Sequence, residues 1–134
     1  MNDKTTYLCG GINGLSDSQC KDWREYAKAN LKTKTLDPMR RDYRGIEAQN
    51  RQLIQANDLS DIAQSDFVLV NATRPSWGTA MELVYAKLLS RTVIGWCDVE
   101  IGKQSPWLVN HCDELTIGLD EAIRAINHRA ERGF

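Results

Sequence analysis

The chain has 134 residues, 42% of them hydrophobic, and its 17 basic and 18 acidic side chains give a formal net charge of −1. A chain of this length can bury one core and is too short for two ordinary domains, so we expect residues 1–134 to form a single domain. The balanced charge provides no global field for a polyanion, which argues against a nucleic acid polymer as partner.

The four cysteines lie far apart, at positions 9, 20, 97 and 112. They show neither the short pair spacing of a zinc site nor the density of a disulfide scaffold, so we expect reduced, semi-buried thiols. The two histidines do not sit among carboxylates or cysteines at ligand spacing, and we expect no metal site. The sequence also shows no apolar signal segment and no membrane span, which predicts a cytoplasmic protein without a membrane partner.

The first predicted unit is a strand over Thr5–Cys9, a glycine-rich loop over 10–14 and a helix to about residue 31 that begins at Ser16 or Asp17. The loop reads Gly-Gly-Ile-Asn-Gly, which has neither the spacing of a dinucleotide fingerprint nor the lysine of a P-loop. It is either a plain tight turn or a loop that presents backbone N–H groups to a phosphate or sugar.

A second strand is predicted over 33–36 and ends at Asp37 and Pro38. The loop over 39–45 contains three arginines and Tyr43, which is typical either of a solvated surface or of a phosphate and base contact. A helical pattern follows over 46–64, with a possible break near Asn57. Asp58 is then either the cap of a second helical piece or a functional carboxylate at the crevice.

The central stretch covers 66–86. An apolar, β-branched run over 67–70 predicts an inner parallel strand, 71–78 predicts a loop, and apolar residues at 81, 84, 85 and 88 predict a helix. Ligands of open α/β sheets bind beyond the carboxyl ends of strands, so a ligand could approach Glu82 beside Gly78. The spacing of Thr79 and Glu82 also fits a capping box, which would occupy the carboxylate with backbone; spacing alone favours that alternative.

The last third predicts a strand over 92–96, a loop over 97–104, a turn or helix start at Ser105, a strand over 115–117 and a helix capped by Asp120. Trp107 is too apolar to be left exposed without a partner. Strands thus alternate with helices five times, which predicts a three-layer α/β sandwich with a mostly parallel five-stranded sheet.

Two motifs carry a family resemblance: YLCGGINGL over residues 7–15 and IQANDLSDIAQSDFVLVNATRPSWGTAMELVYA over 54–86. With these motifs the sequence resembles the nucleoside 2-deoxyribosyltransferase family, in particular its 2′-deoxynucleoside 5′-monophosphate N-glycosidase branch. The resemblance implies a flavodoxin-like or Rossmann-like fold and three catalytic residues. Glu82 would be the nucleophile that forms a covalent glycosyl intermediate, Asp58 would protonate the departing base, and Tyr7 would position the nucleophile.

The resemblance also implies substrate contacts. Ser76 falls where the nucleotide hydrolases place a phosphate-contacting serine and the free-nucleoside transferases an aspartate, whereas Asn13 replaces an arginine of the hydrolases. Ser105 falls roughly where family members reach into a neighbouring subunit's site, which implies a homo-oligomer. The implied substrate-binding set is Gly10, Gly11, Ile12, Asn13, Arg40, Tyr43, Ser76, Trp77, Gly78 and Ser105.

This chemistry is consistent with the residue types. Cleavage of an N-glycosidic bond builds positive charge on the sugar, which an ionised Glu82 at a helix N-terminus would stabilise and capture, and the base leaves well only when a carboxyl such as Asp58 protonates it. No metal or organic cofactor is needed. We therefore expect hydrolysis of a nucleoside 5′-monophosphate, in particular a 2′-deoxynucleotide. The alternatives are a deoxyribosyltransferase that passes the sugar to a second base and a non-catalytic nucleotide-binding sensor.

Overall fold

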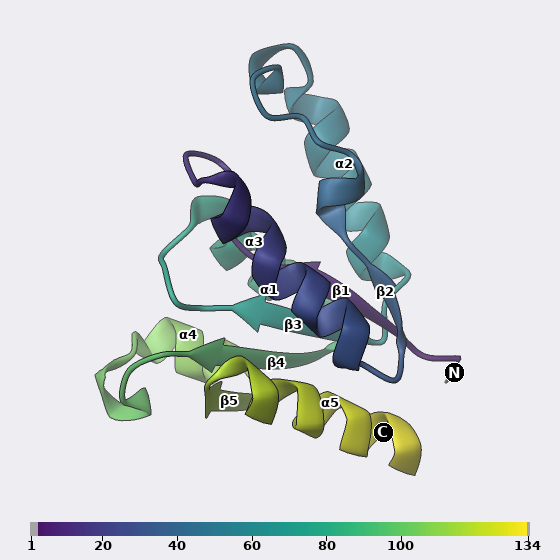
Figure 1. Ribbon diagram of the computed structural model, residues 1–134, viewed down its shortest axis with the longest axis vertical. Helices are drawn as coiled ribbons and strands as arrows, with labels where there is room; N and C mark the ends of the chain where they lie inside the picture. Colours follow the sequence, from purple (N-terminus) through teal and green to yellow (C-terminus); the bar gives the residue numbers. More distant parts are fainter. Residues whose placement is uncertain (1–2, 134) are drawn as a thin grey trace.

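The computed structural model describes residues 3–133. Its centre is a five-stranded sheet in which every pair of neighbouring strands is parallel, in the order β2-β1-β3-β4-β5 (Figure 1). The strands are β1 (Thr5–Cys9), β2 (Lys34–Leu36), β3 (Phe67–Asn71), β4 (Thr92–Cys97) and β5 (Glu114–Ile117). The predicted α/β class is confirmed, and the sheet is wholly parallel rather than mostly so.

Helices cover both faces of this sheet. They are α1 (Asp17–Asn30), α2 (Arg51–Ala63), α3 (Trp77–Leu88), α4 (Pro106–His111) and α5 (Leu119–Arg132). One buried cluster joins α1 and α5 to the sheet, and a second joins α2 and α3 to its other face, with α4 at the edge of that cluster. Alternate side chains of each inner strand therefore enter opposite cores, as the continuous apolar run in β3 predicts.

Helix starts show where local sequence signals suffice and where they do not. Ser16 caps α1 in a full capping box with Gln19. Helix α5 instead begins after Gly118, whose φ of 88° favours glycine, so Asp120 lies in the first turn and the prediction that it caps the helix was wrong.

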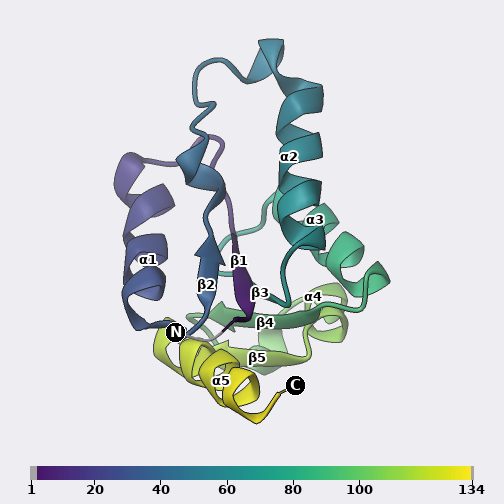
Figure 2. The same cartoon turned by 90° about the vertical axis from the view of Figure 1, so that its right-hand side faces the viewer.

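Helix α2 is continuous, so the predicted break near Asn57 and the capping role of Asp58 are also wrong. A 3₁₀ turn, Glu47–Gln49, precedes it. The outer half of α2 and the loop before it extend beyond the sheet (Figure 2). This arm stands beside the carboxyl end of β1, where the strand order reverses between β1 and β3 and ligands of such folds bind.

No helix within residues 3–133 is long and apolar enough to cross a membrane.

Candidate active site

The start of α3 frees Glu82 from its own backbone. Ser76 is the N-cap residue, and its Oγ accepts a hydrogen bond from the Thr79 amide over 3.4 Å. The capping box between Thr79 and Glu82 is therefore absent, because the helix begins three residues earlier than that pattern requires. Glu82 lies in the second turn of α3, and its carboxylate turns to the sheet.

The face of α3 that packs on the sheet is not the one that the apolar spacing of its sequence predicts. Leu83 and Ala86 are buried, whereas Met81 and Leu88 are 65% and 77% exposed. Glu82 lies three residues after Thr79 and four before Ala86, both of which are buried, so its carboxylate shares the buried side of the helix with them. The apolar spacing identified the helix correctly but not the face that packs on the sheet.

Two side chains of β1 hold the Glu82 carboxylate. The Tyr7 hydroxyl donates to Oε2 over 2.5 Å, and the Cys9 thiol donates to Oε1 over 3.6 Å. Tyr7 is 1% exposed and Cys9 is fully buried. Because residues two apart on a strand point to the same side, β1 presents both donors to α3 at once.

Burial dominates the ionisation of Glu82. Removal from water raises its pKa from 4.5 to about 7; the hydrogen bond from Tyr7 opposes the rise and the charge of Asp58 adds to it. The expectation that the helix N-terminus keeps this group ionised is not met, because the dipole effect fades within the first turn and desolvation exceeds it.

Asp58 lies across the cavity on α2, and burial raises its pKa from 3.8 to about 6. Arg41 lowers that pKa but stands 4.0 Å away, since its guanidinium binds Asp61 more closely, over 2.6 Å. Arg40 also binds Asp61, through two hydrogen bonds of 2.8 and 2.9 Å. Asp61 thus holds both arginines and leaves Asp58 weakly paired.

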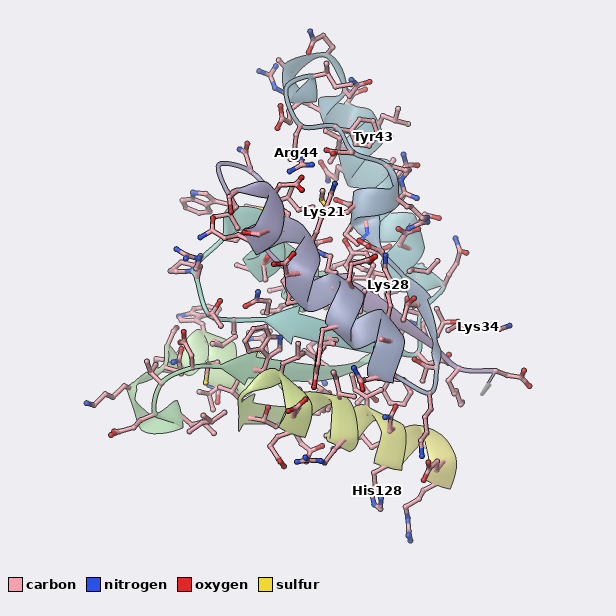
Figure 3. All side chains as sticks on the ribbon, in the orientation of Figure 1. Lys21, Lys28, Lys34, Tyr43, Arg44 and His128 are labelled. Atoms are coloured by element: carbon pink, nitrogen blue, oxygen red, sulfur yellow. The ribbon has the colours of Figure 1, made fainter. Side chains whose placement is uncertain are left out.

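A cavity of about 200 Å³ brings these groups together. Its wall includes the predicted residues Gly10, Ile12, Asn13, Tyr43, Asp58, Ser76, Gly78 and Glu82, and also Met39. Figure 3 shows Tyr43 beside α2 and Arg44 between that arm and the start of α1, where Arg44 pairs with Asp42 and Asp17.

Four predicted residues lie elsewhere. Gly11 faces a neighbouring surface hollow, Arg40 is turned to Asp61, and Trp77 is 85% exposed at the start of α3. Ser105 caps α4, where its Oγ accepts from the Trp107 amide.

Ser105 lines a second, larger cavity of about 540 Å³ between α3 and α4, together with Trp107, which is 77% exposed. Ser76 and Thr79 border both cavities, so the start of α3 separates them.

Sequence reasoning missed three supporting residues. Cys9 could have been found from its position two residues after Tyr7, and Asp61 from its position one helical turn after Asp58. Arg24 is fully buried and donates to the carbonyls of Leu8, Cys20 and Gly10. Its place among the inward positions of α1 was the available signal.

Arg24 fixes the loop that lines the cavity. Its guanidinium bonds the Gly10 carbonyl over 2.9 Å, and a Cβ atom at Gly10 would lie 2.8 Å from Cζ2 of Trp23. The close approach of this loop to α1 therefore requires glycine at position 10.

Comparison with known proteins identifies the architecture. The sequence profile described as nucleoside 2-deoxyribosyltransferase matches residues 6–113, a span that includes Tyr7, Asp58 and Glu82. The chain belongs to this family. Its members are enzymes of the deoxyribosyltransferase and N-glycosidase type that act on small nucleosides or nucleotides.

Several solved structures share the fold of this chain at low sequence identity. A conserved protein from Enterococcus faecalis V583 has a TM-score of 0.72 at 13% identity, with 95% of this chain and 99% of that chain covered. The 2-deoxyribosyltransferase of Bacillus psychrosaccharolyticus has a TM-score of 0.69 at 19% identity, covering 89% and 90%. The CMP N-glycosidase BcmB of Clostridium botulinum has a TM-score of 0.59 at 15% identity, covering 93% and 98%. No curated protein matches by sequence.

Among the described residues 3–133, no three His, Cys, Asp or Glu side chains gather as a metal-binding group.

Proposed function

We propose that residues 1–134 form one catalytic domain that hydrolyses the N-glycosidic bond of a nucleoside 5′-monophosphate, in particular a 2′-deoxynucleotide. The observation that carries this proposal is the position of Glu82: a buried carboxylate, held by Tyr7, in the wall of a cavity that it shares with Asp58. A neutral donor does not neutralise an ionised carboxylate as a cation would, so the charge of ionised Glu82 is available to a cationic transition state.

The reaction takes two steps. In the first, a Glu82 oxygen forms a bond to C1′ of the sugar while the C1′–N bond breaks, and Asp58 gives its proton to the departing base. In the second, Asp58 as a carboxylate takes a proton from water, and the resulting hydroxide attacks C1′ and releases Glu82. Each residue returns to its starting protonation state.

The protonation states define the pH range in which the pair can work. Burial raises the pKa of Asp58 to about 6 and that of Glu82 to about 7, so the pair carries one proton between these pH values. This proton rests mainly on Glu82, and the reactive form, with Glu82 ionised and Asp58 protonated, is the minor of the two singly protonated forms. We expect a bell-shaped pH dependence of kcat/KM with its maximum between about pH 6 and pH 7, because only the singly protonated pair holds both an acid and a nucleophile. A rate that rises steadily above about pH 8 would contradict this pairing.

The start of α3 supports a phosphate at the edge of the cavity. Ser76 and Gly78 line the cavity, and the first amides of a helix attract anions. The hydroxyl of Ser76 can donate to a phosphate oxygen while its oxygen caps the helix, whereas an aspartate there would repel it.

Deoxyribosyl transfer to a second base is the other candidate. It is favoured by Asn13, which brings no charge to the cavity, and by the pairing of Arg41 and Arg44 with carboxylates. These features suit an uncharged nucleoside better than a phosphorylated one.

Product analysis separates the candidates. The protein is incubated with 2′-deoxynucleoside 5′-monophosphates or with free 2′-deoxynucleosides, each with and without a second base, and products are resolved by chromatography. Hydrolysis predicts free base and sugar phosphate without an acceptor, and transfer predicts a new nucleoside only with one.

Intact-mass spectrometry after acid quench tests the intermediate. The wild type should carry one added deoxyribosyl phosphate, and Glu82→Gln should carry none. Base release that persists in Glu82→Gln would show that this residue is not the nucleophile. Glu131→Gln, at an exposed position on α5, is the matched control.

We propose in addition that a second copy of the chain completes the site, and that the protein works in the reducing cytosol that its four free cysteines suit. Exposed apolar side chains lie on the outer face of α3 and on α4, and Ser105 faces the larger cavity rather than the one that holds Glu82. Ser105 can therefore serve glycosidic chemistry only in the site of another copy.

Mixing inactive variants tests this. Glu82→Ala and Ser105→Ala are combined after partial unfolding and refolding, and activity is compared with each alone. Partial recovery indicates a shared site; a monomer in analytical ultracentrifugation would exclude it.

A further inference from the structure

The two oxygens of the Glu82 carboxylate have unequal partners. Oε2 accepts a hydrogen bond of 2.5 Å from the Tyr7 hydroxyl, and Oε1 accepts one of 3.6 Å from the Cys9 thiol. A hydroxyl is a strong donor and a thiol a weak one. Electron density on the two oxygens is therefore withdrawn to different extents.

We propose that Cys9 is a positioning residue for Glu82: its thiol fixes the direction of Oε1 with a weak hydrogen bond, so that Oε1 is the oxygen that attacks the sugar. Tyr7 then restrains the orientation of the carboxylate plane through its hydrogen bond to Oε2. This inference rests on the proposed glycosidic function and adds the identity of the attacking atom.

A thiol suits this task because it restrains without deactivating. A hydroxyl or amide at hydrogen-bond distance would hold Oε1 more firmly and lower its nucleophilicity. Burial and the nearby Glu82 raise the pKa of Cys9 well above its ordinary value, so the group stays a neutral S–H donor. Cys9 is then neither a competing nucleophile nor a second negative charge beside Glu82.

The other charged and titratable groups around this pair come from three elements. Tyr7 and Cys9 stand on β1, Asp58 on α2 and Arg24 on α1; Asp58 raises the pKa of Glu82 and Arg24 lowers it. None of these contacts depends on the Cys9 sulfur, so replacing it changes one partner of the carboxylate and leaves the rest in place.

The first experiment compares Cys9→Ala and Cys9→Val with Cys97→Ala. The valine variant fills the space of the sulfur, so that water does not replace it. Cys97 is an equally buried cysteine of β4 whose thiol donates to the carbonyls of Val99 and Thr116, away from Glu82. The readout is the titration midpoint of the Glu82 carboxyl by carbon-13 NMR, with its resonance assigned through Glu82→Gln.

Loss of the thiol donor should raise this midpoint in both Cys9 variants, because the hydrogen bond from Cys9 lowers the pKa of Glu82. With substrate, kcat should fall about five-fold while KM stays within about two-fold, since a misdirected Oε1 affects the attack and not binding. Cys97→Ala should change neither. Equal shifts in the Cys9 and Cys97 variants, or none, would overturn the proposal.

A second measurement leaves the protein unmodified. The S–H stretching band of Cys9, assigned by its loss in Cys9→Ala, should move as pH passes the ionisation of Glu82, and that movement should vanish in Glu82→Gln. A pH-independent band would show that the thiol does not donate to the carboxylate. Both titrations need no substrate, so failure of the proposed hydrolysis and failure of the Cys9 contact are separate results.

Discussion

The two walls of the cavity hold their carboxylates by different means. On the sheet side, Glu82 is held by neutral donors, Tyr7 and Cys9. On the arm side, Asp61 is held by two arginines, and its pKa is lowered, whereas burial raises the pKa of Asp58 beside it. The strong ion pairs are therefore made by Asp61, which ties Arg40 and Arg41 to α2, and neither of the two carboxyls that share the cavity is strongly paired with a cation.

This difference shows how a site can hold two reactive acids without neutralising them. A guanidinium bound to Glu82 would keep the carboxylate ionised but reduce the attraction of that carboxylate to a cationic sugar. An apolar wall without hydrogen-bond donors would instead keep Glu82 protonated. Hydroxyl and thiol donors orient the group and leave most of its charge available. The following predictions test this comparison, first on the arm side and then on the sheet side.

Replacement of the arm-side acid should give the largest effect. Asp58→Asn keeps the shape of the side chain but removes its proton, so kcat for a natural base should fall on the order of 10³-fold. A substrate whose base is a good leaving group without protonation should lose about ten-fold or less. Asp42→Asn, a change in the same cavity wall, is the control. Equal losses on both substrates would assign Asp58 a binding role.

Ionisation of the sheet-side carboxyl should oppose folding. Because the folded pKa of Glu82, about 7, lies above its ordinary 4.5, the native state binds the proton more tightly than the unfolded chain. This stability is present below about pH 4.5 and is lost as pH rises through 7, a change of about 3 kcal/mol. Glu82→Gln should therefore gain about that much in unfolding free energy relative to wild type between these limits.

Denaturant unfolding at both pH values measures this gain. Glu131→Gln provides the opposite sign, because Lys32 lowers the pKa of that exposed carboxyl. A Glu82→Gln protein whose advantage is the same at both pH values would indicate that desolvation does not dominate at this position.

Removal of the Tyr7 hydroxyl, the strong donor on the sheet side, should give the next largest effect. Tyr7→Phe leaves Oε2 without its 2.5 Å partner, so the pKa of Glu82 rises further and the plane of the carboxylate is less restrained. We expect kcat to fall about 30-fold, with the high-pH side of the profile, which the higher pKa of Glu82 sets, moved to higher pH. Tyr85→Phe, on the same helix as Glu82, is the control. An unchanged profile would place the restraint of Glu82 elsewhere.

Much of the fold was predictable because its signals are local. The apolar run of β3, the capping signals of α1 and the alternation of strands and helices each depend on neighbouring residues. The start of α3 was not predictable from local signals, since both Ser76 and Thr79 are good capping residues. Only the packing of Leu83 and Ala86 on the sheet decides between them. The same packing leaves the apolar outer face of α3 exposed.

The residues of the site were predictable from the sequence, but their ion pairing and pKa values were not. The family motifs point to Tyr7, Asp58 and Glu82, and the fold brings all three together. The pairing of Arg40 with Asp61 instead of the cavity depends on how the arm folds back, which no spacing in the sequence encodes. The pKa values depend on burial, which appears only after both walls have assembled.

The smallest effect concerns the residue where the two walls meet. Ser76 caps α3 and lines the cavity, so Ser76→Ala should lower the unfolding free energy by about 1 kcal/mol and also weaken binding of a phosphorylated substrate. Ser16→Ala is the matched control, because the Ser16 side chain also accepts a hydrogen bond from the amide three residues later, in α1, but lies outside the cavity wall. The two variants should lose similar stability in denaturant unfolding, whereas only Ser76→Ala should raise KM, and only for a 5′-monophosphate. If KM for a free nucleoside rises equally, the hydroxyl positions the sugar and the phosphate lies elsewhere.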